Sequence, residues 1–190
     1  MVGVDEVGRG CLAGPLLVVA AKAFSDLPQA VADSKSLSRS QREQIFEELV
    51  KFCRFGEGWV SCNEIDTRGL AAAMRLGVSR ALRALAVDKN EQIVVDGSVN
   101  YAPKTYRAVE LLVGADGRIP IVSAASIYAK VKRDRYMTRL KSRYPQYGFE
   151  SHVGYGTPAH KEALRSYGIL KNIHRVSFRP LRLIDQGPQA

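Results

Sequence analysis

The sequence contains few of the residues from which disulfide frameworks and zinc sites are built. Its cysteines number 3, with no Cys-x-x-Cys pair, so neither a disulfide framework nor a zinc site is encoded. The histidines, His152, His160 and His174, also lie outside any zinc-ligand spacing. We therefore expect reduced thiols, and histidines that serve as polar or phosphate-contacting residues.

Long apolar runs are also missing. No segment approaches the length of a membrane span, and the first residues lack the basic and apolar regions of a signal peptide. These absences predict a cytoplasmic protein without membrane contact.

Acidic residues are outnumbered by basic ones. The chain has 28 Lys and Arg against 19 Asp and Glu, a formal net charge of +9, which favours an anionic partner and nucleic acid first. A basic protein with a solvated surface would show the same balance. Charge alone therefore leaves a non-catalytic nucleic-acid-binding protein open as an alternative to an enzyme.

The size and the apolar pattern fit one soluble α/β domain. Of 190 residues, 46% are hydrophobic and 25% charged, which predicts a single folded domain over residues 1–184, a flexible tail over 185–190 and, by default, a monomer. Strands are expected at 2–7, 15–24, 54–60, 92–96 and 109–113, and helices at 38–51, 63–85, 121–143 and 158–166. Their alternation predicts the α/β class.

Acidic residues stand in or directly after the predicted strands. Asp5 and Glu6 interrupt an apolar strand, Asp96 ends another, and Asp116 follows the last one. An unpartnered buried carboxylate is costly, whereas Mg²⁺ and Mn²⁺ prefer oxygen ligands. The set predicts a metal-dependent phosphoryl-transfer site, although for Asp96 before Gly97 a simple turn is the better individual explanation.

Several segments resemble bacterial ribonuclease HII, in order along nearly the whole chain. The most specific is V-D-E-V-G-R-G-C-L-A-G-P from Val4 to Pro15. The others are D-S-K-S-L-S from Asp33, V-D-G from Val95, S-A-A-S-I-Y-A-K-V-K-R-D from Ser123, P-Q-Y-G-F from Pro145 and H-R-V-S-F from His174.

The resemblance implies a ribonuclease H-like fold, a mixed central β-sheet flanked by α-helices with a C-terminal helical segment. It implies an endoribonuclease that cleaves the RNA strand of RNA–DNA hybrids and cuts on the 5′ side of single ribonucleotides embedded in duplex DNA. Two Mg²⁺ or Mn²⁺ ions would serve the hydrolysis, leaving 3′-hydroxyl and 5′-phosphate ends. The implied role is removal of ribonucleotides from DNA.

The same resemblance assigns the site residues. Asp5, Glu6, Asp96 and Asp116 match the family's catalytic, metal-binding carboxylates. Residues at substrate-binding positions are Gly8, Arg9, Gly10, Ser34, Lys35, Arg133 and Tyr155. Glycines let a backbone approach the 2′-hydroxyl that separates RNA from DNA, and the hydroxyl and cationic side chains are expected near phosphates. A plain turn at 8–10, an ordinary tyrosine at 155 and solvated surface charge remain the structural alternatives.

Two departures from the family pattern bear on substrate preference. Gly114-Ala115 stands before Asp116 where relatives often carry Lys-Gly, and Val153 stands where Lys is common. The related type III ribonuclease H typically has an extra N-terminal domain and lacks the Gly-Arg-Gly sequence, so the resemblance favours type II.

Overall fold

The structure, a computed structural model, describes residues 1–28, 31 and 37–181, and within them two compact units. The sheet unit comprises Met1–Val7, Leu17–Trp59 and Met74–Val131. The helical unit comprises Gly8–Leu16, Val60–Ala73 and the described residues from Lys132 on. One domain over 1–184 stays a prediction, and the expected tail at 185–190 lies outside the described residues.

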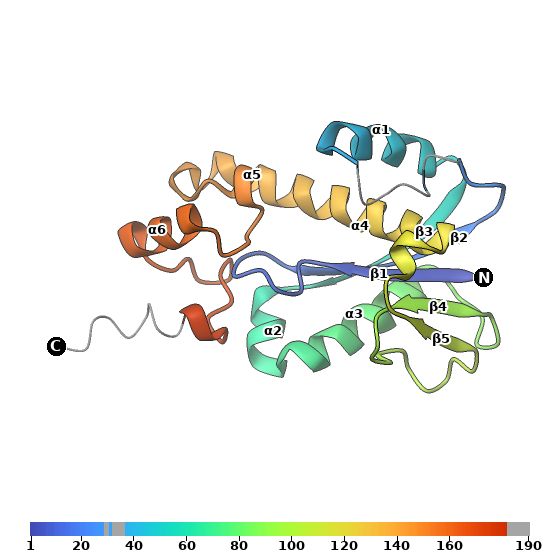
Figure 1. The fold of residues 1–190 in the computed structure, drawn as a ribbon. Coiled ribbons are helices and arrows are strands. Elements are labelled where there is room, and N and C mark those ends of the chain that lie inside the picture. The colour runs from blue at the N-terminus through green and yellow to red at the C-terminus, as the bar shows by residue number, and fades with distance from the viewer. Residues whose placement is uncertain (29–30, 32–36, 182–190) are drawn as a thin grey trace. The chain divides into compact units, whose positions relative to one another are not determined.

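A mixed sheet forms the centre of the sheet unit (Figure 1). Its strands are β1 (Val2–Val7), β2 (Leu16–Ala23), β3 (Cys53–Val60), β4 (Ile93–Asp96) and β5 (Val109–Leu112). They lie in the order β3-β2-β1-β4-β5, with β1 antiparallel to β2 and β1, β4 and β5 mutually parallel. The mixed α/β sheet expected from the sequence is confirmed.

Helices of the sheet unit cover both faces of this sheet. Leu17 and Val19 of β2 belong to the core cluster formed with α1 (Arg39–Leu49) and the first part of α4 (Pro120–Arg139). The alternate residue Val18 points to the other face, where it meets Gly77 of α3 (Leu70–Ala84). Ser38 caps α1 through a capping box with Gln41, as the sequence predicts.

The single helix expected at 63–85 is two helices, so this prediction is wrong. Helix α2 (Cys62–Arg68) ends at Gly69, whose φ of 77° lies in the left-handed region, and α3 starts at the next residue. Glycine adopts this conformation at little cost. The apolar periodicity continues across the break, so it gave no sign that the helix stops there.

The helical unit contains most of the short elements that the sequence pattern missed. They are α5 (Phe149–His152) and the 3₁₀ helices η3 (Leu140–Ser142) and η4 (Pro145–Tyr147), beside the predicted α6 (Pro158–Tyr167). Tyr147 and Phe149 are buried and stack with ring centroids 5.5 Å apart. Helices of one turn carry too little periodicity to be recognised from sequence.

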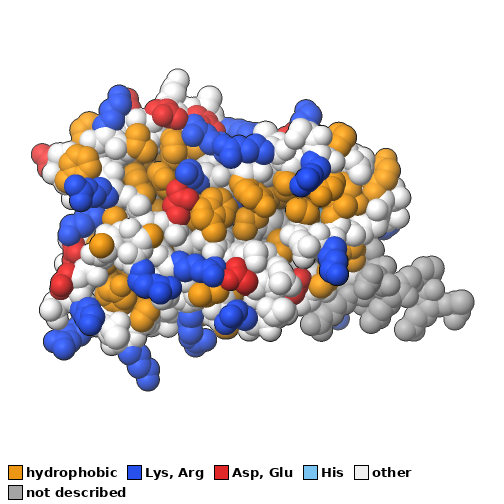
Figure 2. Space-filling view, turned by 180° about the vertical axis from the view of Figure 1, so that it is seen from behind, with side chains coloured by type: hydrophobic (Ala, Val, Ile, Leu, Met, Phe, Trp, Pro, Cys, Tyr) orange, Lys and Arg blue, Asp and Glu red, His pale blue; other side chains and the backbone are white. Residues whose placement is uncertain are grey.

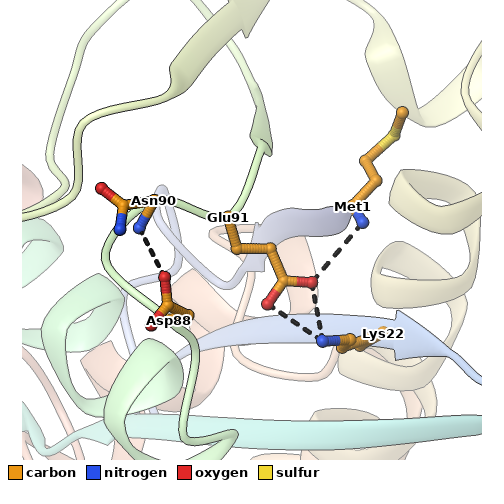
Figure 3. A network of polar contacts seen from close by, with 5 residues as sticks. All are labelled: Met1, Lys22, Asp88, Asn90 and Glu91. Carbon is orange, nitrogen blue, oxygen red and sulfur yellow. Dashed lines mark hydrogen bonds and ion pairs between the residues drawn. The ribbon is translucent and has the colours of Figure 1, made fainter.

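A small polar network joins three strands of the sheet unit (Figure 3). Glu91, just before β4, lies 2.8 Å from the ammonium of Lys22 on β2 and 3.5 Å from that of Met1, which precedes β1. Exposed ion pairs contribute only about 0–1 kcal/mol each. The network therefore links residues at or beside neighbouring strands but contributes little to the free energy of unfolding.

Buried histidines form a network with defined tautomers in the helical unit. His160 and His174 are both 0% exposed, and their Nε2 atoms are 3.2 Å apart. The Leu170 N–H donates to Nδ1 of His174, so the proton of His174 is on Nε2 and is donated to His160. Nδ1 of His160 in turn donates to the Tyr155 carbonyl. Each ring is therefore neutral.

His152 completes this cluster by stacking on His160, with ring centroids 4.2 Å apart. Its Nδ1 accepts from the Gly154 N–H and its Nε2 donates to the Tyr147 carbonyl. The sequence predicted polar or phosphate-contacting histidines, whereas the structure buries all of them among carbonyls and rings. Burial lowers the pKa of His160 and of His174 to about 4.

These low pKa values predict acid sensitivity. Histidines of the unfolded chain bind protons below pH ~6.5, whereas the buried rings stay neutral down to about pH 4. The stability contributed by the neutral histidine network is therefore complete above pH 6.5 and is lost as the pH falls toward 4. Two such groups give a slope of up to about 2.7 kcal/mol per pH unit. Urea unfolding from pH 7.5 to 4.5 measures it. His160→Asn, whose amide can still donate to Tyr155, should remove about half of that slope, and an unchanged slope would contradict the assignment.

Candidate active site

Two parallel strands place Asp5 and Asp96 side by side. In the register of β1 and β4, Val4 pairs with Val95, so the next residues along the strands are Asp5 and Asp96. Both side chains lie on the sheet face that contacts α4. Residues two apart on a strand share a face, and Gly3, two residues before Asp5, contacts Ile121 of that helix. Strand pairing thus brings together carboxylates 91 positions apart in the sequence.

The Asp5 carboxylate is held in a buried, polar environment. It is 8% exposed, its Oδ1 accepts the Glu6 N–H at 2.7 Å, and the side chain of Ser126 on α4 hydrogen-bonds to it. Burial raises the pKa of Asp5 to about 7, although the Ser126 hydrogen bond opposes the shift, and the negative charges of Glu6 and Asp96 raise it further.

A short loop after β5 brings Asp116 toward the same strand ends. The Ala115 N–H donates to Oδ1 of Asp96 at 2.8 Å, and Gly114 before it has a φ of 73°. The Ser123 hydroxyl, on α4, donates to the carbonyl of Asp116 in the 3₁₀ helix η2 (Ala115–Gly117). The Gly-Ala departure from the family pattern thus sits in a turn where glycine relieves backbone strain.

Glu6 and Asp116 line one cavity of about 230 Å³ in the sheet unit. Ser126, the partner of Asp5, lines it as well. The remaining lining residues are Val7, Arg42, Ile127 and Lys130. Arg42 and Lys130 were not predicted as site residues, because one basic residue on a helix looks like any other solvated charge until its neighbours are known.

The predicted carboxylates fit a hard divalent cation in kind. All are oxygen donors. Burial and the neighbouring carboxylates disfavour the negative charge of Asp5 and so raise its pKa. A bound cation would offset this cost of the negative charge. Within the described residues no three His, Cys, Asp or Glu side chains converge closely enough to form a ligand set.

The predicted substrate loop and Tyr155 both belong to the helical unit. Gly8 has a φ of 84°, and no heavy atom lies within 4 Å of where a Cβ on Gly10 would stand. Tyr155 is 41% exposed and its hydroxyl neighbours the thiol of Cys11, next to the Gly-Arg-Gly sequence. Burial, with the Cys11 thiol as the next cause, raises the pKa of Tyr155. The structure thus brings the loop and the tyrosine together.

Arg133 does not lie where its expected role requires. It is 0% exposed and donates to the carbonyls of Pro15, Val153 and Ala13, so a substrate phosphate cannot touch it in this conformation. Ser34 and Lys35, the other residues expected near phosphates, lie outside the described residues.

The chain is similar to known proteins over nearly its whole length. Residues 2–180 match the family model described as Ribonuclease HII. A ribonuclease HII of Cupriavidus necator is 43% identical over 185 residues, covering 95% of this chain and 76% of the relative. The crystal structure of ribonuclease H2 from Pyrococcus horikoshii OT3 superposes with a TM-score of 0.77 at 31% identity, covering 97% of this chain and 96% of that one.

A more distant structure shares the fold alone. Bst-RNase HIII, solved in complex with Mn²⁺, has a TM-score of 0.72 at 20% identity, covering 97% of this chain and 68% of that one.

The mixed five-stranded sheet, its flanking helices and these structural neighbours define a protein of the ribonuclease H-like fold. The chain belongs to the ribonuclease HII family. Members of this family are type 2 ribonucleases H, which are hydrolases, and membership supports endonuclease activity on the RNA of RNA–DNA hybrids. No helix of the described residues is long and apolar enough to cross a membrane.

Proposed function

We propose that this protein cuts the RNA strand of RNA–DNA hybrids and the 5′ side of single ribonucleotides embedded in duplex DNA, leaving 3′-hydroxyl and 5′-phosphate ends. The observation that carries the proposal is the meeting of acidic residues at strand ends. Asp5 and Asp96 are neighbours across β1 and β4, and Glu6 and Asp116 line one cavity. Clustered carboxylates repel phosphates unless a cation is bound, so they would weaken binding in a protein that only binds nucleic acid.

Asp5, Glu6, Asp96 and Asp116 would hold two Mg²⁺ or Mn²⁺ ions. Such ions lower the pKa of an attacking water and stabilise charge on the leaving oxygen of a phosphodiester. The protein's own part is to orient the carboxylates: Ser126 and the Glu6 N–H fix Asp5, and the Ala115 N–H fixes Asp96. Lys130 and Arg42, beside Glu6 in the cavity, add positive charge where a phosphate would approach.

Substrate recognition is assigned to the Gly8-Arg9-Gly10 loop and Tyr155. The loop has backbone polar groups that can bond a 2′-hydroxyl, the group that distinguishes a ribonucleotide. The ring of Tyr155 is exposed and so accessible for stacking on a sugar. Lys and Arg side chains are spread over the face shown in Figure 2, in keeping with the net charge of +9 and with contacts to two phosphate backbones. Ser34 and Lys35 are proposed phosphate contacts on the family pattern alone.

A labelled DNA duplex with one ribonucleotide tests the proposal. With Mg²⁺ or Mn²⁺ we expect a single cut 5′ to the ribonucleotide. With chelator, and with an all-DNA duplex of the same sequence, we expect none, because the ions and the 2′-hydroxyl are then missing. Gel mobility beside size markers identifies the cut and its end groups.

Two results would count against it. Cutting of the all-DNA control at a similar rate would indicate a nuclease without ribonucleotide recognition. Binding of the duplex with no cut under either metal would favour the non-catalytic alternative. We further propose that the protein acts as a monomer in the cytoplasm, which sedimentation and cell fractionation would test.

A further inference from the structure

The segment Gly8–Pro15 follows the strand that carries Asp5 and is tied to the rest of the helical unit by its backbone. The Leu12 N–H donates to the Gly154 carbonyl at 2.9 Å, the Gly14 N–H donates to the Ile173 carbonyl at 2.8 Å, and the Arg175 N–H donates to the Leu12 carbonyl at 2.8 Å. These bonds hold the second half of the segment. None of them involves Gly8, Arg9 or Gly10, the part assigned to the substrate.

Arg133 secures the segment from one side. Its side chain is 0% exposed and lies on α4. Nε donates to the Pro15 carbonyl at 2.8 Å, Nη2 to the Ala13 carbonyl at 3.0 Å and Nη1 to the Val153 carbonyl at 2.8 Å. It also packs against Gly8, where an added Cβ would stand 2.2 Å from Nε of Arg133.

Arg175 secures the segment from the C-terminal part of the chain. It is also 0% exposed, and its Nε and Nη2 both donate to the Gly14 carbonyl, at 3.0 and 2.8 Å. Its Nη1 donates to the Arg9 carbonyl at 2.9 Å. This last bond reaches directly into the Gly-Arg-Gly sequence.

Burying two guanidinium groups is costly unless each finds good partners. Here the partners are main-chain carbonyls, and four of them belong to one short segment: those of Arg9, Ala13, Gly14 and Pro15. A planar guanidinium directs several donors at fixed angles, which a lysine ammonium cannot do. The arginines are therefore suited to fix a backbone shape rather than to neutralise charge.

The backbone that they contact has positive φ angles, which glycine adopts readily and valine does not. Gly8 and Gly14 have φ values of 84° and 83°, and Val153, whose carbonyl Arg133 binds, has a φ of 43°. For a β-branched residue a positive φ is a strained conformation. Such a backbone persists only where surrounding contacts hold it.

We propose that Arg133 and Arg175 are positioning residues that hold the Gly8-Arg9-Gly10 backbone in the shape that recognises the 2′-hydroxyl. The proposal rests on the proposed function. On this proposal Arg133 binds main-chain carbonyls of the protein and does not make the expected phosphate contact. Misplacement of a reacting group by about 1 Å can lower a rate about 100-fold, so loosening this loop should impair turnover more than binding.

Arg133→Lys and Arg175→Lys test the proposal, with metal present and the single-ribonucleotide duplex as substrate. Each keeps the charge but loses the fork of donors. We expect kcat to fall about 100-fold, with KM changed by less than about 3-fold. Amide hydrogen exchange, read by mass spectrometry on peptides spanning residues 8–15, should become faster. The second variant keeps the measurement possible if the first does not fold.

Tyr147→Phe is the matched control for lost stability. The Tyr147 hydroxyl donates to the carbonyls of Tyr167 and Gly168 at 3.0 and 2.9 Å, which lie in the same unit and outside the segment Gly8–Pro15. It should lower the melting temperature while leaving kcat and loop exchange unchanged. An equal loss of kcat in this control, or unchanged kcat in the lysine variants, would overturn the proposal.

Failure of the proposed function would be seen separately. If the unmodified protein does not cut the ribonucleotide duplex, the proposed function fails. Loop exchange in Arg133→Lys and Arg175→Lys still decides whether the arginines hold the segment, and exchange at the rate of the unmodified protein would overturn the positioning role by itself.

Discussion

Asp5→Asn is expected to abolish cleavage at a ribonucleotide while duplex binding stays within a few-fold of the unmodified protein. Asp5 is the most buried of the four carboxylates and neighbours both Glu6 and Asp96. An amide of the same shape is a much poorer ligand for a hard cation than a carboxylate. The basic surface that binds phosphates is untouched by this change.

The variant should nevertheless fold at least as well as the unmodified protein in metal-free buffer. The Asn side-chain oxygen can still accept the Glu6 N–H, and its amide can donate to Ser126. Removing the charge also removes the repulsion from Glu6 and Asp96 that raises the pKa of Asp5. Loss of activity would then report loss of the metal site rather than unfolding.

Cleavage rate, duplex affinity and melting temperature should be measured together for this variant. Asp88→Asn is the matched control, since Asp88 lies in the same unit and its Oδ1 accepts the Asn90 N–H in a turn (Figure 3). The control should cleave normally. Normal cleavage by Asp5→Asn would remove the main support for the proposed site.

Gly3→Ala should strongly destabilise the sheet unit. A Cβ on Gly3 would stand 2.5 Å from both the carbonyl carbon and the oxygen of Ile121 and 2.6 Å from the nitrogen of Val122. These are backbone atoms at the start of α4, so no side chain can move aside. Either β1 or α4 would have to shift, and these elements carry Asp5 and its partner Ser126.

The expected cost is about 3 kcal/mol, the upper end for overpacking in a tight core. At roughly 2–4 °C per kcal/mol for a chain of this size, the melting temperature should fall by about 6–12 °C. Gly10→Ala serves as the stability control, because no heavy atom lies within 4 Å of the place that its Cβ would take. Calorimetry of both variants gives the comparison, and equal melting temperatures would show that β1 and α4 are not in close contact.

Local patterns were sufficient for the elements that carry the chemistry. The first strand was predicted at 2–7 and is observed at Val2–Val7, and the predicted strand at 92–96 is observed as Ile93–Asp96. Apolar runs interrupted or ended by an acid are visible without any tertiary information. The same reasoning failed at Gly69, because a single glycine within a helical pattern is compatible with both a continuous helix and a stop.

The sequence by itself determined the α/β class, the candidate carboxylates and the family, because strand periodicity and a contiguous motif are properties of neighbouring residues. Only the tertiary structure decided that Asp5 is buried beside Asp96. It also decided that His160 and His174 are neutral core residues, and that Arg133 and Arg175 donate to the main chain of one loop. Arg133 and Ala13 are 120 residues apart along the chain. Burial and partnership at such separations arise from packing of distant segments, and they decide whether a charged side chain meets a substrate or the protein's own backbone.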